Sequence, residues 1–358
     1  MAGRAASIRW VGMTGLGLLL AAISVLAQPP SPPKGGSQDP NRPKVAFTSV
    51  DFVDLEGTYY RGKSRDTPCV LLVHKWSSDR TKSGWDELAR LLQAEGFAVL
   101  TFDLRGHGGS TNVSPSFWTL SPNRNGILRA NPKTQSTIDY KNFKPNYFPW
   151  VVNDLLSARR FLETKNDAGD LNAGSLFVVG AQEGASLGME FVVSEWYRTY
   201  TVGFKALQSN GVTKTAGADI AGCVWLSLPI RPSVSTALPM RDWIRTTAGV
   251  RDNNPMCFIY GEKDSRAKAD ADELYRALTA GPTPRDKHKH MLLEIKGTDL
   301  AGQALLGPAA SALGVPQRIV EYIKKVMAER RQIAWSEMEV SSNPLQTVNV
   351  RALGVSVP

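Results

Sequence analysis

The sequence predicts an α/β fold in which helices cover both faces of a mostly parallel sheet. Short apolar runs, of the kind buried on both faces of a parallel sheet, alternate along the chain with segments of helical spacing. This alternation favours right-handed crossover units. The length of 358 residues and the hydrophobic content of 42% are sufficient for one large domain with a buried core.

The first predicted elements are mainly strands. Two segments of alternating character, Val45–Phe52 and Leu55–Tyr60, open the domain. The continuous apolar run Cys69–Val73 predicts a buried strand. Helical spacing follows in Trp85–Ala94, and Phe97–Phe102 is the next buried strand.

A long segment rich in Asn, Pro and Ser interrupts this pattern at residues 111–147. It carries the aromatic residues Phe117, Trp118, Tyr140 and Phe143. Loops of this length inside compact domains are usually functional, so we expect a lid or cover.

Strands and helices alternate again after this segment. The predicted order is helix Trp150–Leu162, strand Leu176–Val179, helix Gly184–Trp196, strand Gly222–Leu228, strand Met256–Tyr260, helix Ala269–Leu278, strand Met291–Ile295 and helix Val315–Arg331. The last residues, 334–358, form a weakly patterned C-terminal extension, in which Val348 and Val350 suggest an added edge strand.

The N-terminal residues predict export. Arg4 and Arg9 precede the apolar run Trp10–Leu26, and small residues suited to cleavage end at Ala27. We therefore interpret 1–27 as a signal peptide, 28–44 as a Pro-rich linker and 45–333 as the folded domain. A run of about 17 apolar residues is also close to the lower limit for spanning a bilayer, so an uncleaved membrane anchor is the alternative.

Charge and cysteine content indicate which partners and which disulfide bonds to expect. The formal charge is +9, and a basic cluster lies on the predicted last helix, where contact with an anionic lipid or polymer stays open. Nucleic acid is not an expected partner of an exported chain. The three cysteines Cys69, Cys223 and Cys257 lie in apolar runs and are expected to be buried free thiols. A bridge between Cys223 and Cys257 is the alternative if their strands are neighbours.

Four short motifs occur in order along the chain. They are Val70-Leu71-Leu72-Val73-His74, Phe102-Asp103-Leu104-Arg105-Gly106-His107-Gly108-Gly109-Ser110, Phe177-Val178-Val179-Gly180-Ala181-Gln182-Glu183-Gly184-Ala185 and Ile259-Tyr260-Gly261-Glu262-Lys263-Asp264. Together they resemble the α/β-hydrolase superfamily, of dienelactone-hydrolase and esterase type, over about residues 45 to 330. The resemblance implies an eight-stranded sheet, and it implies that these motifs are the oxyanion strand, the turn after the fourth strand, the nucleophile elbow and the acid strand.

The resemblance assigns Gln182 to the nucleophile position, between Gly180 and Gly184. An amide has no activated oxygen with which to begin acyl-enzyme chemistry. The nearby Gly184-Ala185-Ser186-Leu187-Gly188 also matches the serine motif of these enzymes. Ser186, however, lies four residues beyond Gln182, about 6 Å along the helix axis, and is expected to be a packing residue.

Of the other two triad positions, one is filled and one is substituted. Asp264 fits the acid position, and the resemblance places either Asp299 or Leu300 at the histidine position, of which we assign Leu300. His290 is the last histidine of the chain and precedes the predicted strand Met291–Ile295. Five residues of extended chain would place His290 about 17 Å from the far end of that strand. The general base is therefore expected to be missing.

A binding mouth is expected even without a complete triad. Backbone N–H groups of Lys75 and Glu183 would be the oxyanion donors. Side chains of His74, Trp76 and His107 are expected at the carboxyl ends of the strands, where open α/β sheets bind ligands. We expect Asp103 and Arg105 to form an ion pair or a loop brace. No spaced cluster of metal ligands occurs, so neither metal nor cofactor is predicted.

Three functional hypotheses follow. The first is a non-catalytic hydrolase-like protein that binds a small molecule or an envelope ligand through the mouth. The second is an active ester or peptide hydrolase that uses residues other than the usual triad. The third is a purely structural protein whose mouth is filled by side chains.

Overall fold

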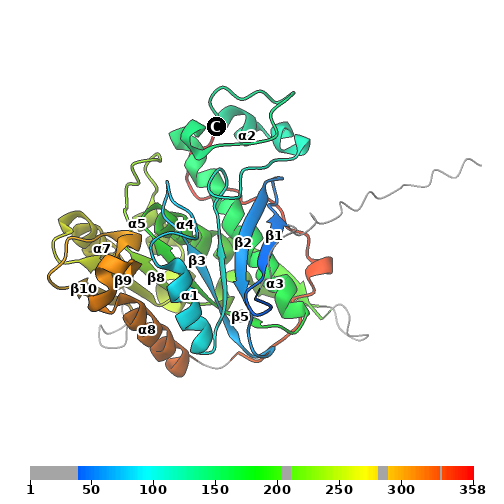
Figure 1. Cartoon of the computed structure of the whole chain (residues 1–358). Coiled ribbons are helices and arrows are strands. Elements are labelled where there is room, and N and C mark those ends of the chain that lie inside the picture. Colours follow the sequence, from blue (N-terminus) through cyan, green and yellow to red (C-terminus); the bar gives the residue numbers. More distant parts are fainter. Residues whose placement is uncertain (1–38, 204–210, 281–288, 331–332) are drawn as a thin grey trace, which may run out of the picture.

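A computed structural model describes residues 39–203, 211–280, 289–330 and 333–358. Its centre is an eight-stranded sheet with the order β1-β2-β4-β3-β5-β8-β9-β10 (Figure 1). The strands are β1 Lys44–Thr48, β2 Asp54–Tyr60, β3 Pro68–Val73, β4 Ala98–Phe102, β5 Asn172–Ala181, β8 Ile220–Leu226, β9 Met256–Gly261 and β10 Met291–Ile295. A separate hairpin pairs β6 Thr199–Val202 with β7 Val212–Thr215.

Most of the sheet is parallel. β2 pairs with β1 and with β4 in antiparallel fashion, and the other five pairings of the sheet are parallel. Every residue of the central strand β5 is buried, as expected for a strand covered on both faces. The predicted fold class is therefore confirmed.

Helices cover both faces of the sheet. They are α1 Trp85–Ala94, α2 Ser121–Gly126, α3 Val152–Asp167, α4 Glu183–Tyr197, α5 Met240–Thr246, α6 Ala248–Asn253, α7 Ser265–Leu278 and α8 Val315–Glu329. Short 3₁₀ helices connect them: η1 Pro115–Thr119, η2 Tyr140–Asn142, η3 Pro145–Val151, η4 Ala216–Asp219, η6 Gly302–Leu306, η7 Pro308–Leu313 and η8 Val340–Ser342.

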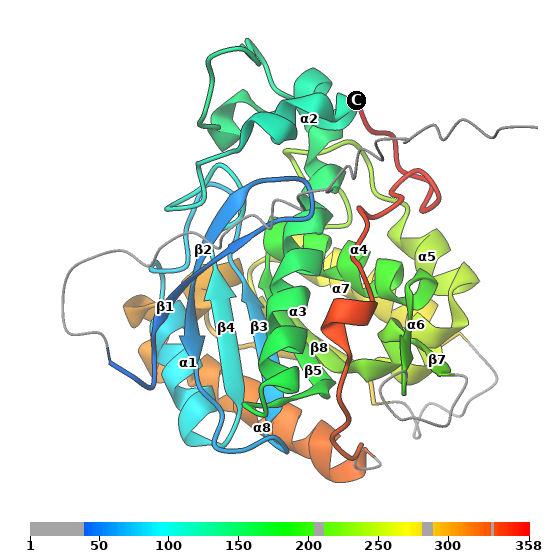
Figure 2. The ribbon, with the colours of Figure 1, turned by 90° about the vertical axis from the view of Figure 1, so that its right-hand side faces the viewer.

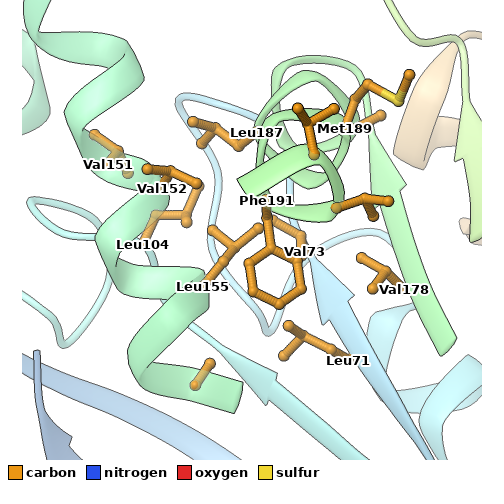
Figure 3. Packing of buried hydrophobic residues seen from close by; sticks show 14 of the residues in the cluster. Leu71, Val73, Leu104, Val151, Val152, Leu155, Val178, Leu187, Met189 and Phe191 are labelled. Carbon is orange, nitrogen blue, oxygen red and sulfur yellow. The ribbon is translucent and has the colours of Figure 1, made fainter. Parts of the chain in front are cut away.

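The alternation of side chains along each strand creates two separate cores. Leu71 and Val73 of β3 pack on one face with Leu155 of α3 and Phe191 of α4 (Figure 3). The intervening residues, such as Leu72, belong to a second cluster on the other face, to which α1 and α8 contribute. Successive side chains of a strand point to opposite faces, and both faces are buried here. Each strand is therefore an uninterrupted hydrophobic segment in the sequence.

The segment expected to be a lid forms a packed cap at one end of the sheet, where α2 lies in Figure 1. It is anchored by bridges such as Val53 to Val113. Phe117 of this segment is buried, and the rings of Tyr140 and Phe143 each lie 6.0 Å from the ring of Trp76. Hydrophobic contacts thus hold the cap on the loop that follows β3.

The C-terminal extension crosses α3 and ends close to α2 (Figure 2). Val348 N–H donates to Asn153 Oδ1 of α3 at 2.8 Å, and Trp243 Nε1 of α5 donates to the Leu353 carbonyl at 2.7 Å. The expectation of an edge strand through Val348 and Val350 is wrong, because the extension binds helices rather than the sheet.

Other predictions about individual segments have mixed outcomes. Cys223 and Cys257 lie on the neighbouring strands β8 and β9, yet they are free, buried thiols, as is Cys69. The predicted signal peptide, and the linker up to residue 38, lie outside the described residues. No helix in the described part of the chain is long and apolar enough to cross a membrane.

Candidate functional site

The candidate site is centred on the turn that joins β5 to α4. Gln182 has φ 50° and ψ −120°, a conformation that L-residues rarely adopt. Its N–H donates to the Leu226 carbonyl at 2.9 Å, and its carbonyl accepts from Ala185 N–H at 2.9 Å. Backbone hydrogen bonds on both sides therefore hold the strained turn in place.

Glycines make this turn sterically feasible. A Cβ on Gly180 would lie 2.7 Å from Cα of Ala185, and one on Gly184 would collide with backbone carbonyls of β3 and of His74. Any larger residue at either position would push α4 away from the sheet.

The start of η6 lies against the Gln182 side chain. Gly302 has φ +55°, and a Cβ there would lie 2.6 Å from Oε1 of Gln182. Gly302 N–H donates to Ser227 Oγ at 2.9 Å. Ser227 follows β8 and has φ 49°, so two strained positions meet beside Gln182.

Next to this contact, Gln303 occupies the expected oxyanion region. Its Oε1 accepts from Lys75 N–H at 3.1 Å and from Trp85 Nε1 at 3.2 Å, while its Nε2 donates to Ser78 Oγ at 2.7 Å. The Lys75 N–H is thus already satisfied by a protein amide. Glu183, the other expected donor, begins α4, where first-turn N–H groups have no acceptor within the helix.

The candidate acid and base positions lie in neighbouring loops. Asp264 caps α7, and its Oδ1 accepts from Ala267 N–H at 3.0 Å. Leu300 is partly buried against the second hydrophobic cluster, and its N–H donates to Thr298 Oγ1 at 3.1 Å. A hydrocarbon side chain at this place cannot accept or deliver a proton.

We call the open space beside Gln182 the elbow hollow. Its volume is about 260 Å³, and it is lined by Gln182, Glu183, Ser227, Leu228, Pro229, Ser233, Asp264, Arg266, Ala267, Asp270 and Ala301. Three carboxylates face one arginine in this lining. Within the described chain the Gln182 amide makes no hydrogen bond, so both its donors and its acceptor are available to a ligand.

His74 and His107 lie together at the carboxyl ends of β3 and β4, as expected, with ring centroids 5.3 Å apart, but they do not line the elbow hollow. His74 Nδ1 donates to the Lys75 carbonyl at 2.7 Å, and its Nε2 accepts from Leu104 N–H at 3.0 Å. His107 is bonded in the same way, to the Arg105 carbonyl at 2.9 Å and to Ser77 N–H at 3.2 Å. Both rings are buried, and this burial lowers the pKa of His74 to about 4 and that of His107 to about 3.

Trp76 is likewise buried, and its ring lies 4.7 Å from the His107 ring. The ring nitrogens of His74 and His107 are satisfied by backbone groups, so these rings support the loops after β3 and β4. A sequence motif does not indicate in which direction a loop side chain points.

Asp103 and Arg105 do brace loops, but not as a pair. Asp103 binds Arg80 and accepts from Gly109 N–H at 2.9 Å. Arg105 lies fully buried between Asp51 and Asp154, with ion-pair distances of 2.6 Å to each. Asp103 and Arg105 each brace a loop, as expected, but they do not form an ion pair with each other.

Two residues that resemble catalytic groups lie elsewhere. Ser186 is buried, and its hydroxyl donates to the Pro229 carbonyl at 2.9 Å. His290 precedes β10, where its Nδ1 accepts from Met256 N–H at the start of β9. Both strands run in parallel from His290 toward the loops beside Gln182, so His290 lies at the opposite end of these strands.

Comparison with solved structures gives the same architecture. An esterase of Pyrococcus furiosus matches with a TM-score of 0.50 and 18% identity, over 83% of this chain and 97% of that one. A dienelactone hydrolase of Anabaena variabilis gives a TM-score of 0.48 at 17% identity, over 80% and 98% of the two chains. The chain has the α/β-hydrolase fold. No family model matches the sequence, and no curated protein matches it.

Three residues that pack around the strained turn of this α/β-hydrolase fold were not predicted from the sequence. Gly302 lies against Gln182, Gln303 accepts from Lys75 N–H, and Ser227 accepts from Gly302 N–H. All three belong to segments with no motif of their own. The described residues contain no group of three or more His, Cys, Asp or Glu side chains that could hold a metal ion.

Proposed function

We propose that this chain is an exported, non-catalytic protein with the α/β-hydrolase fold that binds a ligand through the elbow hollow. The observation that carries the proposal is the residue at the strained turn. Gln182 presents an unpaired amide where acyl-transfer chemistry would require an activated hydroxyl or thiol. Export rests on the sequence alone, namely Arg4, Arg9 and the apolar run that ends before Ala27.

The surroundings of Gln182 support this proposal. Leu300 cannot serve as a base, and neither ring nitrogen of His74 is available, because both are bonded to backbone. The Gln303 amide also takes the hydrogen bond that a developing oxyanion would need from Lys75. Nucleophile, base and oxyanion donor are therefore altered together.

The lining of the elbow hollow indicates the chemistry of the ligand. Glu183, Asp264 and Asp270 outnumber the single cation Arg266. A ligand rich in N–H or O–H donors, with positive rather than negative charge, fits this lining. An amino sugar with a free amine, such as glucosamine, carries an ammonium group and several hydroxyls and has such chemistry.

The first experiment measures hydrolysis of short-chain p-nitrophenyl esters by the purified chain and by Gln182→Ser. We expect neither protein to exceed the buffer rate by more than about tenfold, because the introduced serine would still lack a base. Gln182→Ala and Ser186→Ala are the matched controls. Robust turnover that survives Gln182→Ala but disappears in Ser186→Ala would contradict the proposal and favour an active hydrolase.

The second experiment tests binding by thermal shift with glucosamine, using glucose as the uncharged comparison. A ligand that prefers the native state raises the melting temperature by mass action. We expect a larger shift with glucosamine, and a reduced shift in Asp270→Asn. Equal melting-temperature shifts with glucosamine and glucose, in both the parent chain and Asp270→Asn, would count against the elbow hollow as an amine-binding site.

A further inference from the structure

A second, larger hollow lies under the C-terminal extension, and we call it the tail hollow. Its volume is about 420 Å³, within the range of small-molecule sites. One wall comes from α3, the end of α4 and β6, and the other from residues 343–353 of the extension. It shares no lining residue with the elbow hollow.

Apolar side chains contribute much of its surface. Leu156, Tyr200 and Leu353 are largely buried where they meet it. Tyr197, at the end of α4, keeps 60% of its surface exposed although it is an aromatic residue beside a hydrophobic cluster. Such a combination of a buried apolar floor and an exposed ring is typical of sites that bind an apolar body.

The charged residues next to the hollow neutralise one another. Arg159, Arg160 and Arg198 form ion pairs of 2.6 to 3.4 Å with three carboxylates, those of Glu163, Glu195 and Asp219. Three cations therefore face three anions in one closed network. Because no net charge is left over, an ionic ligand would gain no counter-charge here.

One donor nevertheless remains available. Arg198 lines the hollow and uses Nε and Nη2 to bind Glu195 and Glu163. Its Nη1 makes no hydrogen bond within the described parts of the chain. A guanidinium N–H that has no partner can bind a neutral carbonyl or hydroxyl oxygen of a ligand.

From these observations we infer that the tail hollow binds a neutral molecule that combines an apolar body with an oxygen acceptor. The inference goes beyond the proposed function of the elbow hollow, since the two sites are lined by different residues. The C-terminal extension is then a wall of a binding site rather than a passive strap.

The test uses Prodan, a neutral naphthalene ketone whose emission shifts to the blue in apolar surroundings. The full chain should bind it saturably, at one site, and at least about tenfold more tightly than the anionic anilinonaphthalene sulfonate. Ala352→Trp and Gln346→Trp place an indole in the hollow at exposed positions of its wall. Each should weaken Prodan binding at least about tenfold.

Two control variants test whether the effect is specific to the tail hollow. Ala334→Trp adds the same indole at an exposed position outside the hollow, and Ser233→Trp adds it in the elbow hollow. Neither should change Prodan affinity, and all four variants should keep the far-ultraviolet circular dichroism of the parent. Non-saturable binding, tighter binding of the sulfonate, or unchanged affinity in both Ala352→Trp and Gln346→Trp would overturn the inference. Loss of affinity only in Ser233→Trp would move the Prodan site to the elbow hollow.

Discussion

Gln182 combines a strained backbone with an amide side chain that makes no hydrogen bond within the described chain. The turn keeps the φ of 50° that presents a side chain above the sheet, although such a conformation costs on the order of 1 to 3 kcal/mol. Neighbouring hydrogen bonds and the close approach of Gly302 hold it. A purely structural turn would not need a strained non-glycine residue, which supports a binding role for the amide.

Gly302→Ala tests how tightly the two loops fit. The new Cβ would collide with the Gln182 side chain and would also strain a φ of +55°. We expect the free energy of unfolding to fall by about 2 to 3 kcal/mol, measured by urea denaturation. Gly297→Ala is the matched control: its φ is +75° but nothing lies within 4 Å, so it should cost only about 1 kcal/mol. Equal losses in both variants would mean that the Gln182 contact contributes nothing.

Single residues also show what the sequence can and cannot predict about the site. The position of Gln182 follows from a local pattern of strand, glycine and helix, and the structure has a strained turn there. The contact from Gln303 to Lys75 joins residues 228 positions apart, and no local pattern indicates it. His74 and His107 fit a family motif, but their orientation depends on backbone groups of another loop.

At the scale of one element, α4 contains two buried glutamates in opposite surroundings. Glu195 binds Arg159 at 2.9 Å and Arg198 at 2.6 Å. Glu190 is equally buried, but neither carboxylate oxygen has a hydrogen-bond partner, and burial raises its pKa well above the usual value. At about 100° per residue, Glu190 lies nearly opposite Gly188, which contacts Trp225 of the sheet.

These two glutamates give a matched pair of substitutions with opposite expected signs. A raised folded-state pKa means that Glu190 lowers stability as pH rises above 4.5, so Glu190→Met should increase the unfolding free energy at pH 7 by at least about 1 kcal/mol. Glu195→Met should decrease it by about 3 to 5 kcal/mol, because it leaves buried arginines unpaired. Urea denaturation at pH 7 measures both. A destabilised Glu190→Met would show that its carboxyl has a favourable role.

Element length explains which parts of the fold were predictable. The long helices α1, α4 and α8 and the apolar strands appear within a few residues of their predicted bounds, since each has a periodic pattern. The helices α5 and α6 have seven and six residues, and the strands β6 and β7 have four each. Segments this short contain too few residues to show a period, and tertiary contacts decide their conformation.

On the scale of the whole molecule, the buried histidines link the fold to pH. Burial lowers the pKa of His74 and His107 from 6.5 to about 4 and about 3. Both stay neutral in the native state while the unfolded chain takes up protons below pH 6.5. Their contribution to stability is therefore complete above pH 6.5 and is lost as pH falls toward 4.

We expect the free energy of unfolding to be lower at pH 5 than at pH 7. Each histidine should account for about 2 kcal/mol of the difference, since one pH unit corresponds to about 1.4 kcal/mol per proton. In His107→Gln the loss between these two pH values should shrink by about 2 kcal/mol, even though the variant is less stable throughout. An unchanged pH difference would show that His107 is not held neutral in the fold.

Finally, the hydrogen bond from Trp85 to Gln303 gives this protein a built-in spectroscopic reporter. Gln303 Oε1 accepts from both the indole of Trp85 and the backbone N–H of Lys75, so any ligand that displaces the Gln303 amide also changes the environment of one buried indole. In ¹⁵N-labelled protein the ¹H–¹⁵N resonance of the Trp85 indole would then follow opening of the oxyanion region directly, without an attached dye or a chromogenic substrate.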